Sequence, residues 1–92
     1  MELSELRKEI DQVNEDLLDL FLRRMALSEE VAAYKQAHGL PVLNAQREQE
    51  ILEAMADRAG AEMAPYVCQL FSTLFTLSRA RQDALLHRQE ER

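Results

Sequence analysis

Several charged and polar residues of this 92-residue chain stand where the surrounding pattern requires apolar side chains. Arg24 lies between Leu20 and Leu27, in a series of apolar residues spaced alternately by three and four. Burying an unpaired guanidinium costs several kcal/mol, so Arg24 must pair with a protein carboxylate, bind an anionic ligand or extend its head to water. Ser28 and Lys35 follow four and eleven residues later, on nearly the same helix face. Two cations on one apolar face favour an anionic ligand.

Similar interruptions occur in two later helical segments. Ser78 and Gln82 are four residues apart, so they stack on one helix face, inside an apolar stripe that resumes at Leu85. Both could be structural, with Ser78 bonded to its own helix and Gln82 at the rim of the core. Arg47 and Glu48 fall in the first turn of the second segment, where either residue alone could simply be solvated. The sequence leaves these alternatives open.

The motifs of metal-dependent and nucleophilic catalysis are absent from the sequence. It contains no CxxC, HExxH, phosphate loop or glycine-rich nucleotide fingerprint. His38 and His87 lack the spacing of metal ligands, and their peripheral positions argue against a histidine-activated nucleophile. We therefore expect a site without metal or cofactor, in which fixed charges and hydrogen-bond donors act on the ligand.

Three helices must position these residues. Glycine and proline occur only twice each, within residues 39–41 and residues 60–65. These breaks divide the chain into predicted helices over residues 3–37, 44–59 and 64–89. Because β-branched and aromatic residues are too sparse for strands, the sequence predicts an all-α fold.

The first predicted helix is too long for a compact monomer. At about 1.5 Å per residue, residues 3–37 span roughly 50 Å. A compact chain of this length is only about 32 Å across. The helix must therefore extend beyond a globule made from one chain, and its apolar stripe needs a partner. A homodimer is the most economical solution.

Composition limits the class, the partners and the location of the protein. The chain forms one domain, residues 1–92, whose 47% hydrophobic content supports a modest core. A net charge of −6 argues against nucleic acid and anionic membrane surfaces as partners. The single Cys68 excludes an internal disulfide and fits a reducing compartment. With no signal peptide and no apolar run of membrane-spanning length, we expect a soluble cytoplasmic protein.

Taken together, these residues resemble a known family. The resemblance is carried by the segments LRKEIDQVNEDLLDLFLRRMALSEEVAAYK, PVLNAQRE and LFSTLFTLSRARQ. They are similar to the all-helical chorismate mutases, whose prototype is the N-terminal domain of bacterial chorismate mutase–prephenate dehydratase. The resemblance covers essentially the whole chain and implies three helices intertwined in a homodimer with two equivalent sites. It also implies conversion of chorismate to prephenate, a unimolecular rearrangement without proton transfer.

The resemblance further implies a cationic cage for the two carboxylates of chorismate. Its members would be Arg24, Lys35 and Arg47 of one chain and Arg7 of the partner chain. Arg7 and Arg24 are 17 residues apart, or about 26 Å along one helix, so one chain cannot bring both to a small ligand. In an antiparallel dimer, the Arg7 end of one chain can meet the middle of the other.

The remaining roles implied by the resemblance concern the ring hydroxyl and the ether oxygen. Glu48 would accept a hydrogen bond from the hydroxyl, and Ser78 would help to hold a carboxylate. Gln82 and Lys35 would donate to the ether oxygen, which gains negative charge as its bond breaks. Asn44 occupies a position where the family often has aspartate, and its amide can still form a hydrogen bond with the hydroxyl.

Two other functions are compatible with this sequence. Isochorismate–pyruvate lyases share the fold and a similar cationic pocket, although the full-length first helix and the pair Lys35 and Gln82 favour the mutase. A non-catalytic helical dimerisation or regulatory module would not need so many polar residues inside apolar stripes. Because the chain leaves no room for a dehydratase, dehydrogenase or regulatory domain, we expect a monofunctional enzyme.

Overall fold

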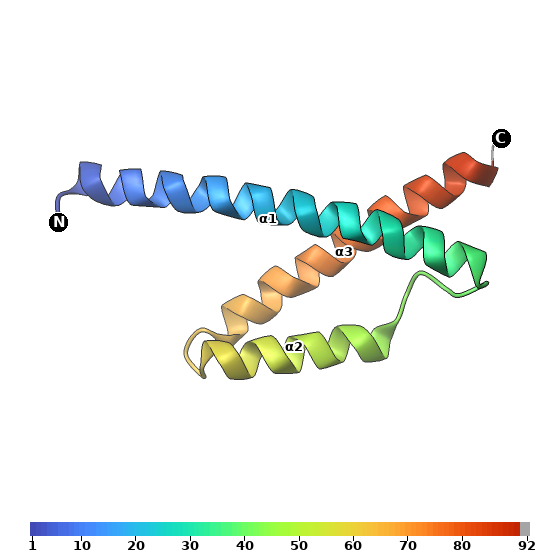
Figure 1. The fold of residues 1–92 in the computed structure, drawn as a ribbon. Coiled ribbons are helices and arrows are strands. Elements are labelled where there is room, and N and C mark those ends of the chain that lie inside the picture. Colours follow the sequence, from blue (N-terminus) through green and yellow to red (C-terminus); the bar gives the residue numbers. More distant parts are fainter. Residues whose placement is uncertain (91–92) are drawn as a thin grey trace.

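The computed structural model describes residues 1–90, with side chains described for residues 1–88. It contains three α-helices, α1 (Leu3–Ala37), α2 (Ala45–Ala59) and α3 (Ala64–Glu90), and no strand in the described part of the chain (Figure 1). The all-α prediction is therefore confirmed, and the predicted helix boundaries agree with the observed ones to within a residue.

The ends of the helices follow from the two glycine-containing breaks. After α1, the backbone N–H of His38 donates to the carbonyl of Tyr34 at 3.1 Å, and Gly39 then adopts a φ of 64°. Such a left-handed residue is a common way to end a helix, because it redirects the chain while satisfying the last carbonyl groups. Gly60, with a φ of 87°, is itself the C-cap of α2, and its backbone N–H donates to the carbonyl of Ala56 at 3.2 Å. The chain then turns within a few residues into α3.

The third helix holds the other two together. It packs against both α1 and α2, whereas the backbones of α1 and α2 do not approach each other closely in the described residues. Figure 1 shows α3 crossing the C-terminal half of α1, while the N-terminal half extends away from the other helices. The dimensions of 55 × 29 × 14 Å and the radius of gyration of 16.6 Å describe an elongated molecule. A compact chain of this length would have a radius of about 12 Å.

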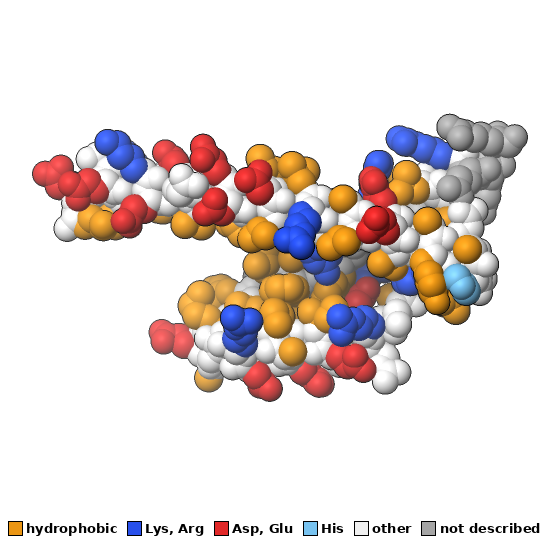
Figure 2. All heavy atoms as spheres, viewed as in Figure 1, with side chains coloured by type: hydrophobic (Ala, Val, Ile, Leu, Met, Phe, Trp, Pro, Cys, Tyr) orange, Lys and Arg blue, Asp and Glu red, His pale blue; other side chains and the backbone are white. Residues whose placement is uncertain are grey.

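The apolar stripe in the N-terminal half of α1 has no partner within the described chain. Its members are 41% to 60% exposed: Leu3, Leu6, Ile10, Val13, Leu17 and Leu20. Figure 2 shows apolar side chains along the lower side of this half of α1. Among the described apolar residues, only Ala32 and Phe75 are buried. The helix therefore extends beyond the globule, as its length predicted.

No helix in the described part of the chain combines the length and apolar character needed to cross a membrane.

Candidate active site

Seven of the eight residues predicted for the site come together in one pocket between the three helices. The cavity has a volume of about 350 Å³. The seven are Arg24, Lys35, Asn44, Arg47, Glu48, Ser78 and Gln82. Arg7 is the exception, because it lies on the extended N-terminal part of α1 and does not line the pocket.

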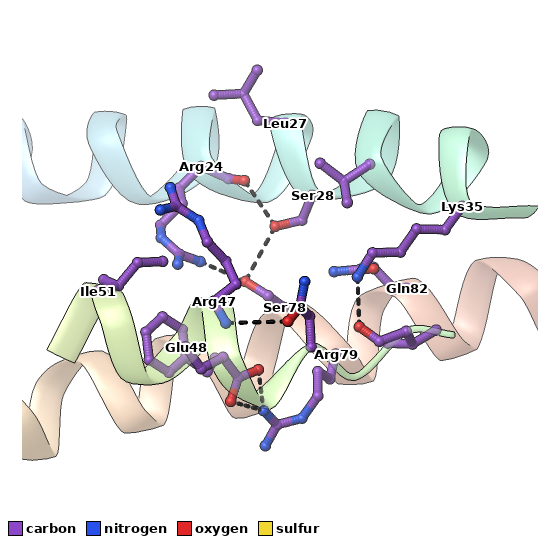
Figure 3. A pocket seen from close by; sticks show the side chains of 14 residues that line it. Arg24, Leu27, Ser28, Lys35, Arg47, Glu48, Ile51, Ser78, Arg79 and Gln82 are labelled. Carbon is purple, nitrogen blue, oxygen red and sulfur yellow. Dashed lines mark hydrogen bonds and ion pairs between the residues drawn. The ribbon is translucent and has the colours of Figure 1, made fainter. Parts of the chain in front are cut away.

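Arg24 enters the pocket from α1 and has no acidic partner in the described residues. Its Nη1 donates to Ser78 Oγ on α3 at 2.6 Å (Figure 3). The guanidinium also lies over the ring of Phe75, 5.6 Å from the centroid, which is a favourable cation–π arrangement. No protein carboxylate therefore offsets the charge of Arg24, so the structure argues against a structural ion pair and favours an anionic ligand.

Two buried serines hold Arg24 in position. Ser28 Oγ lies 3.1 Å from the carbonyl oxygen of Arg24 and 3.1 Å from Ser78 Oγ. Ser28 is 8% exposed and Ser78 is 7% exposed, so water does not compete strongly for these hydrogen bonds. Ser78 accepts from Arg24, and its own hydroxyl proton is free to point at Ser28. The chain of hydroxyl groups fixes the guanidinium against both α1 and α3.

Lys35 and Gln82 approach the pocket from α1 and α3. Lys35 Nζ donates to the carbonyl oxygen of Val42 at 2.6 Å, which uses one of its three protons. Gln82 is only 6% exposed, and its Oε1 is buried without a hydrogen-bond partner in the described part of the chain. A buried polar atom without a partner costs about 1–3 kcal/mol. The amide nitrogen of Gln82 also makes no hydrogen bond within the described residues, so it is available to donate to a ligand in the pocket.

The start of α2 supplies Asn44, Arg47 and Glu48. Asn44 caps the helix, because its Oδ1 accepts from the backbone N–H of Arg47 at 3.1 Å. The amide nitrogen of Asn44 remains available to donate. The side chain of Arg47 is 66% exposed and lies 3.9 Å from the carboxylate of Glu50, so this cation is held only weakly. Asn44 thus has a structural role as well as a place in the pocket.

Glu48 is paired with Arg79, a pocket residue that is not among the eight predicted from the sequence. Arg79 on α3 also lines the pocket, and its Nη1 donates to both carboxylate oxygens of Glu48. One signal was available in the sequence: Arg79 follows Phe75 by four residues and precedes Gln82 by three, so it shares their helix face. Ser28, noted earlier only as a neighbour of Arg24 on its face, is a second pocket residue.

The pocket carries a strong positive charge. Four cations and one carboxylate, Glu48, line it, which gives a net charge of +3 from one chain. The cations are Arg24, Lys35, Arg47 and Arg79. Within the described residues, no group of three or more histidine, cysteine, aspartate or glutamate side chains is arranged to hold a metal ion. The arrangement can bind a small dianion and direct donors at one of its oxygens.

The protein is thus an all-helical protein with a cationic pocket suited to a small dianion. Comparison with known proteins agrees with this class. The chain belongs to the chorismate mutase type II family, because the model of that family matches residues 6–83. The resemblance found in the sequence is therefore confirmed.

Individual relatives are similar to different extents. The T-protein of Haemophilus influenzae is 39% identical over 61 residues, which cover 63% of this chain and 16% of that protein. The bifunctional chorismate mutase/prephenate dehydratase of Aquifex aeolicus is 42% identical over 52 residues, 56% of this chain and 14% of that protein. The 4-amino-4-deoxychorismate mutase of Streptomyces venezuelae is 29% identical over 94 residues, 96% of this chain and 87% of that protein. The match thus spans a small part of the first two relatives and most of the third.

Proposed function

We propose that this chain is a chorismate mutase, an isomerase that converts chorismate to prephenate by a unimolecular Claisen-type rearrangement. The observation that carries the proposal is that one pocket holds both a cation without an acidic partner in the described residues, Arg24, and a buried amide, Gln82, whose nitrogen donates to no other described group. Chorismate is a dianion whose ether oxygen gains negative charge as its bond to the ring breaks. The pocket has groups suited to both features.

Binding of the two carboxylates is assigned to the cations. Arg24 is preorganised by Ser78 and Ser28, so little side-chain entropy is lost when it binds an anion. Arg47 is exposed and can move to the second carboxylate, and Lys35 is a further cation of the same pocket. The charge of +3 exceeds the charge of −2 on the substrate, which favours capture of a dianion.

Acceleration of the reaction is assigned to Lys35 and Gln82. Both would donate to the ether oxygen, where negative charge develops in the transition state. A modest enzyme must lower the barrier by about 8 kcal/mol. Two preorganised donors at roughly 3 kcal/mol each supply most of this. Restricting the flexible enolpyruvyl side chain over the ring supplies the remainder.

The ring hydroxyl is assigned to Glu48 and Asn44. Glu48 retains acceptor capacity beside Arg79, because a carboxylate has about four lone-pair sites. The amide nitrogen of Asn44 is not used by the helix cap and can donate to the hydroxyl oxygen. The two residues would fix the ring so that the side chain reacts on the correct face.

A homodimer with Arg7 supplied in trans completes the proposal. The exposed apolar stripe of α1 requires a partner, and a second copy offers an identical stripe for an isologous interface. Arg7 lies about 26 Å from Arg24 along α1 and so cannot reach the pocket of its own chain. An antiparallel partner would bring its Arg7 to the pocket and raise the local charge further. Location in the cytoplasm also remains a proposal, compatible with the free Cys68.

Loss of the ultraviolet absorbance of the chorismate diene on adding purified protein tests the function. Proton NMR should identify prephenate as the product. Unchanged chorismate at micromolar enzyme would overturn the proposal. Isochorismate should be tested in parallel, because a lyase of the same fold would release pyruvate and fluorescent salicylate.

A second candidate substrate is 4-amino-4-deoxychorismate, in which an amino group replaces the ring hydroxyl. The similarity to the Streptomyces venezuelae mutase favours it, because that match extends over 96% of this chain and 87% of the relative. The reaction would be the same rearrangement in the same pocket. The two substrates differ only in the group that meets Glu48 and Asn44.

A further inference from the structure

Arg79 is a pocket residue to which the proposed reaction assigns no role. It lies one residue after Ser78 on α3, and its guanidinium contacts the carboxylate of Glu48 on α2 (Figure 3). The side chains of Arg79 and Glu48 are 31% and 24% exposed, so solvent screens the ion pair less than it screens a fully exposed pair. The contact uses one nitrogen, Nη1, for both carboxylate oxygens. Among the described residues, the only acidic group lining the pocket is therefore already paired with a cation.

The ion pair leaves the region around Glu48 without net negative charge. Arg79 offsets the carboxylate, and the adjacent Asn44 is neutral. The remaining charged groups of the pocket, Arg24, Lys35 and Arg47, are all positive. A neutral hydroxyl needs only an acceptor for one hydrogen bond, and Glu48 still provides it. An aliphatic ammonium group needs a counter-ion, because burying its charge without one is unfavourable.

We propose that Arg79 is a specificity-determining residue, which offsets the charge of Glu48 so that the site selects a ring hydroxyl over a ring ammonium group. This inference rests on the proposed function and adds the basis for its choice of substrate. Amines of this kind are largely protonated near neutral pH. The ammonium group of 4-amino-4-deoxychorismate would meet a carboxylate that is already neutralised and, next to it, the positive charge of Arg79. The wild-type protein should therefore prefer chorismate.

The test compares kcat/KM for chorismate and for its 4-amino analogue in four proteins. Arg79→Met removes the charge and retains an unbranched side chain. Arg79→Lys retains the charge, and one ammonium group can replace the single nitrogen that contacts Glu48. Arg81→Met is the matched control, because Arg81 is also an α3 arginine paired with a glutamate, Glu29, at 2.7 Å, but does not line the pocket. Circular dichroism confirms that each variant is folded.

The readout is the ratio of the two kcat/KM values. Arg79→Met should shift this ratio toward the amino substrate by about tenfold or more, chiefly through a higher kcat/KM for that substrate. In Arg79→Lys and Arg81→Met the ratio should stay within about threefold of the wild-type value. A merely structural role of Arg79 would lower kcat/KM for both substrates together and leave the ratio unchanged.

Failure of the inference and failure of the proposed function give different results. A wild-type protein that rearranges chorismate, with an unchanged ratio in Arg79→Met, overturns the inference alone. A wild-type protein that prefers the amino analogue also overturns it. If the wild type rearranges neither compound, the proposed function is wrong. The ratio of the two Kd values, measured by calorimetry, then decides whether Arg79 still selects against the ammonium group. Absence of binding of both compounds overturns both.

Discussion

Replacing Gln82 with leucine should lower the activity of the enzyme without lowering its stability. The amide oxygen of Gln82 is buried without a partner in the described residues, which costs about 1–3 kcal/mol in the free protein. Leucine fills a similar volume without a polar atom. The free energy of unfolding of Gln82→Leu should therefore be unchanged or higher by up to about 2 kcal/mol. Its kcat should fall about a hundredfold to a thousandfold, because one donor to the developing oxyanion is lost.

Gln82→Glu should make this hydrogen-bond donor dependent on pH. A neutral amide donates at every ordinary pH, whereas a carboxyl group donates only when it is protonated. Ionised, it would face the developing negative charge and raise the barrier. We expect kcat/KM of Gln82→Glu to be far below wild type at about pH 8 and to recover markedly toward about pH 5.

The measurement is kcat/KM against pH for wild type, Gln82→Glu and Gln82→Leu, with circular dichroism at each pH. Gln82→Leu should remain weak throughout, since it has no proton to regain. If Gln82→Glu follows the wild-type profile without recovery in acid, Gln82 does not donate to the ether oxygen. Substantial loss of stability in Gln82→Leu would show that the amide has a structural partner.

Three further outcomes follow from the same structure. Sedimentation equilibrium should show a dimer at micromolar concentration, because the apolar stripe of α1 is exposed in one chain; a folded, cooperative monomer would contradict this. Ser28→Ala should lower kcat/KM roughly tenfold with little loss of helix, since it removes one hydrogen bond from the group that positions Arg24. Ser72→Ala, at an exposed position on α3, is its control, and equal effects would exclude the positioning role. Isochorismate should give no salicylate fluorescence, and its appearance would indicate lyase activity.

The helices and most of the pocket could be predicted from the sequence because each depends on a local signal. Gly39 and Gly60 mark the breaks between helices, and both adopt a positive φ. The sequence predicts Arg24 and Gln82 as site residues because each polar side chain interrupts a regular apolar stripe. An interruption of this kind can be read from one helix alone, without knowledge of its neighbours.

The partner of Glu48 could not be predicted because it depends on packing between helices. Glu48 and Arg79 are 31 residues apart, and α2 and α3 must be placed before their contact becomes visible. In the sequence SRARQ, Arg79 shares a helix face with Gln82, but Arg81 follows Ser78 by three residues. The spacing therefore does not separate Arg79 from Arg81, which pairs with Glu29 outside the pocket. The proposed role of Arg7 depends in addition on the arrangement of two chains, because the pocket that it would reach belongs to the partner chain.

Mixing two inactive variants tests the shared site most directly. Arg7→Ala and Arg24→Ala should each nearly abolish chorismate mutase activity while retaining helix content. When equal amounts are unfolded and refolded together, half of the dimers should be heterodimers, each with one intact and one doubly altered site. Random pairing should thus restore about a quarter of the wild-type activity. A mixture as inactive as its two components would show that Arg7 and Arg24 do not meet across an interface between two chains.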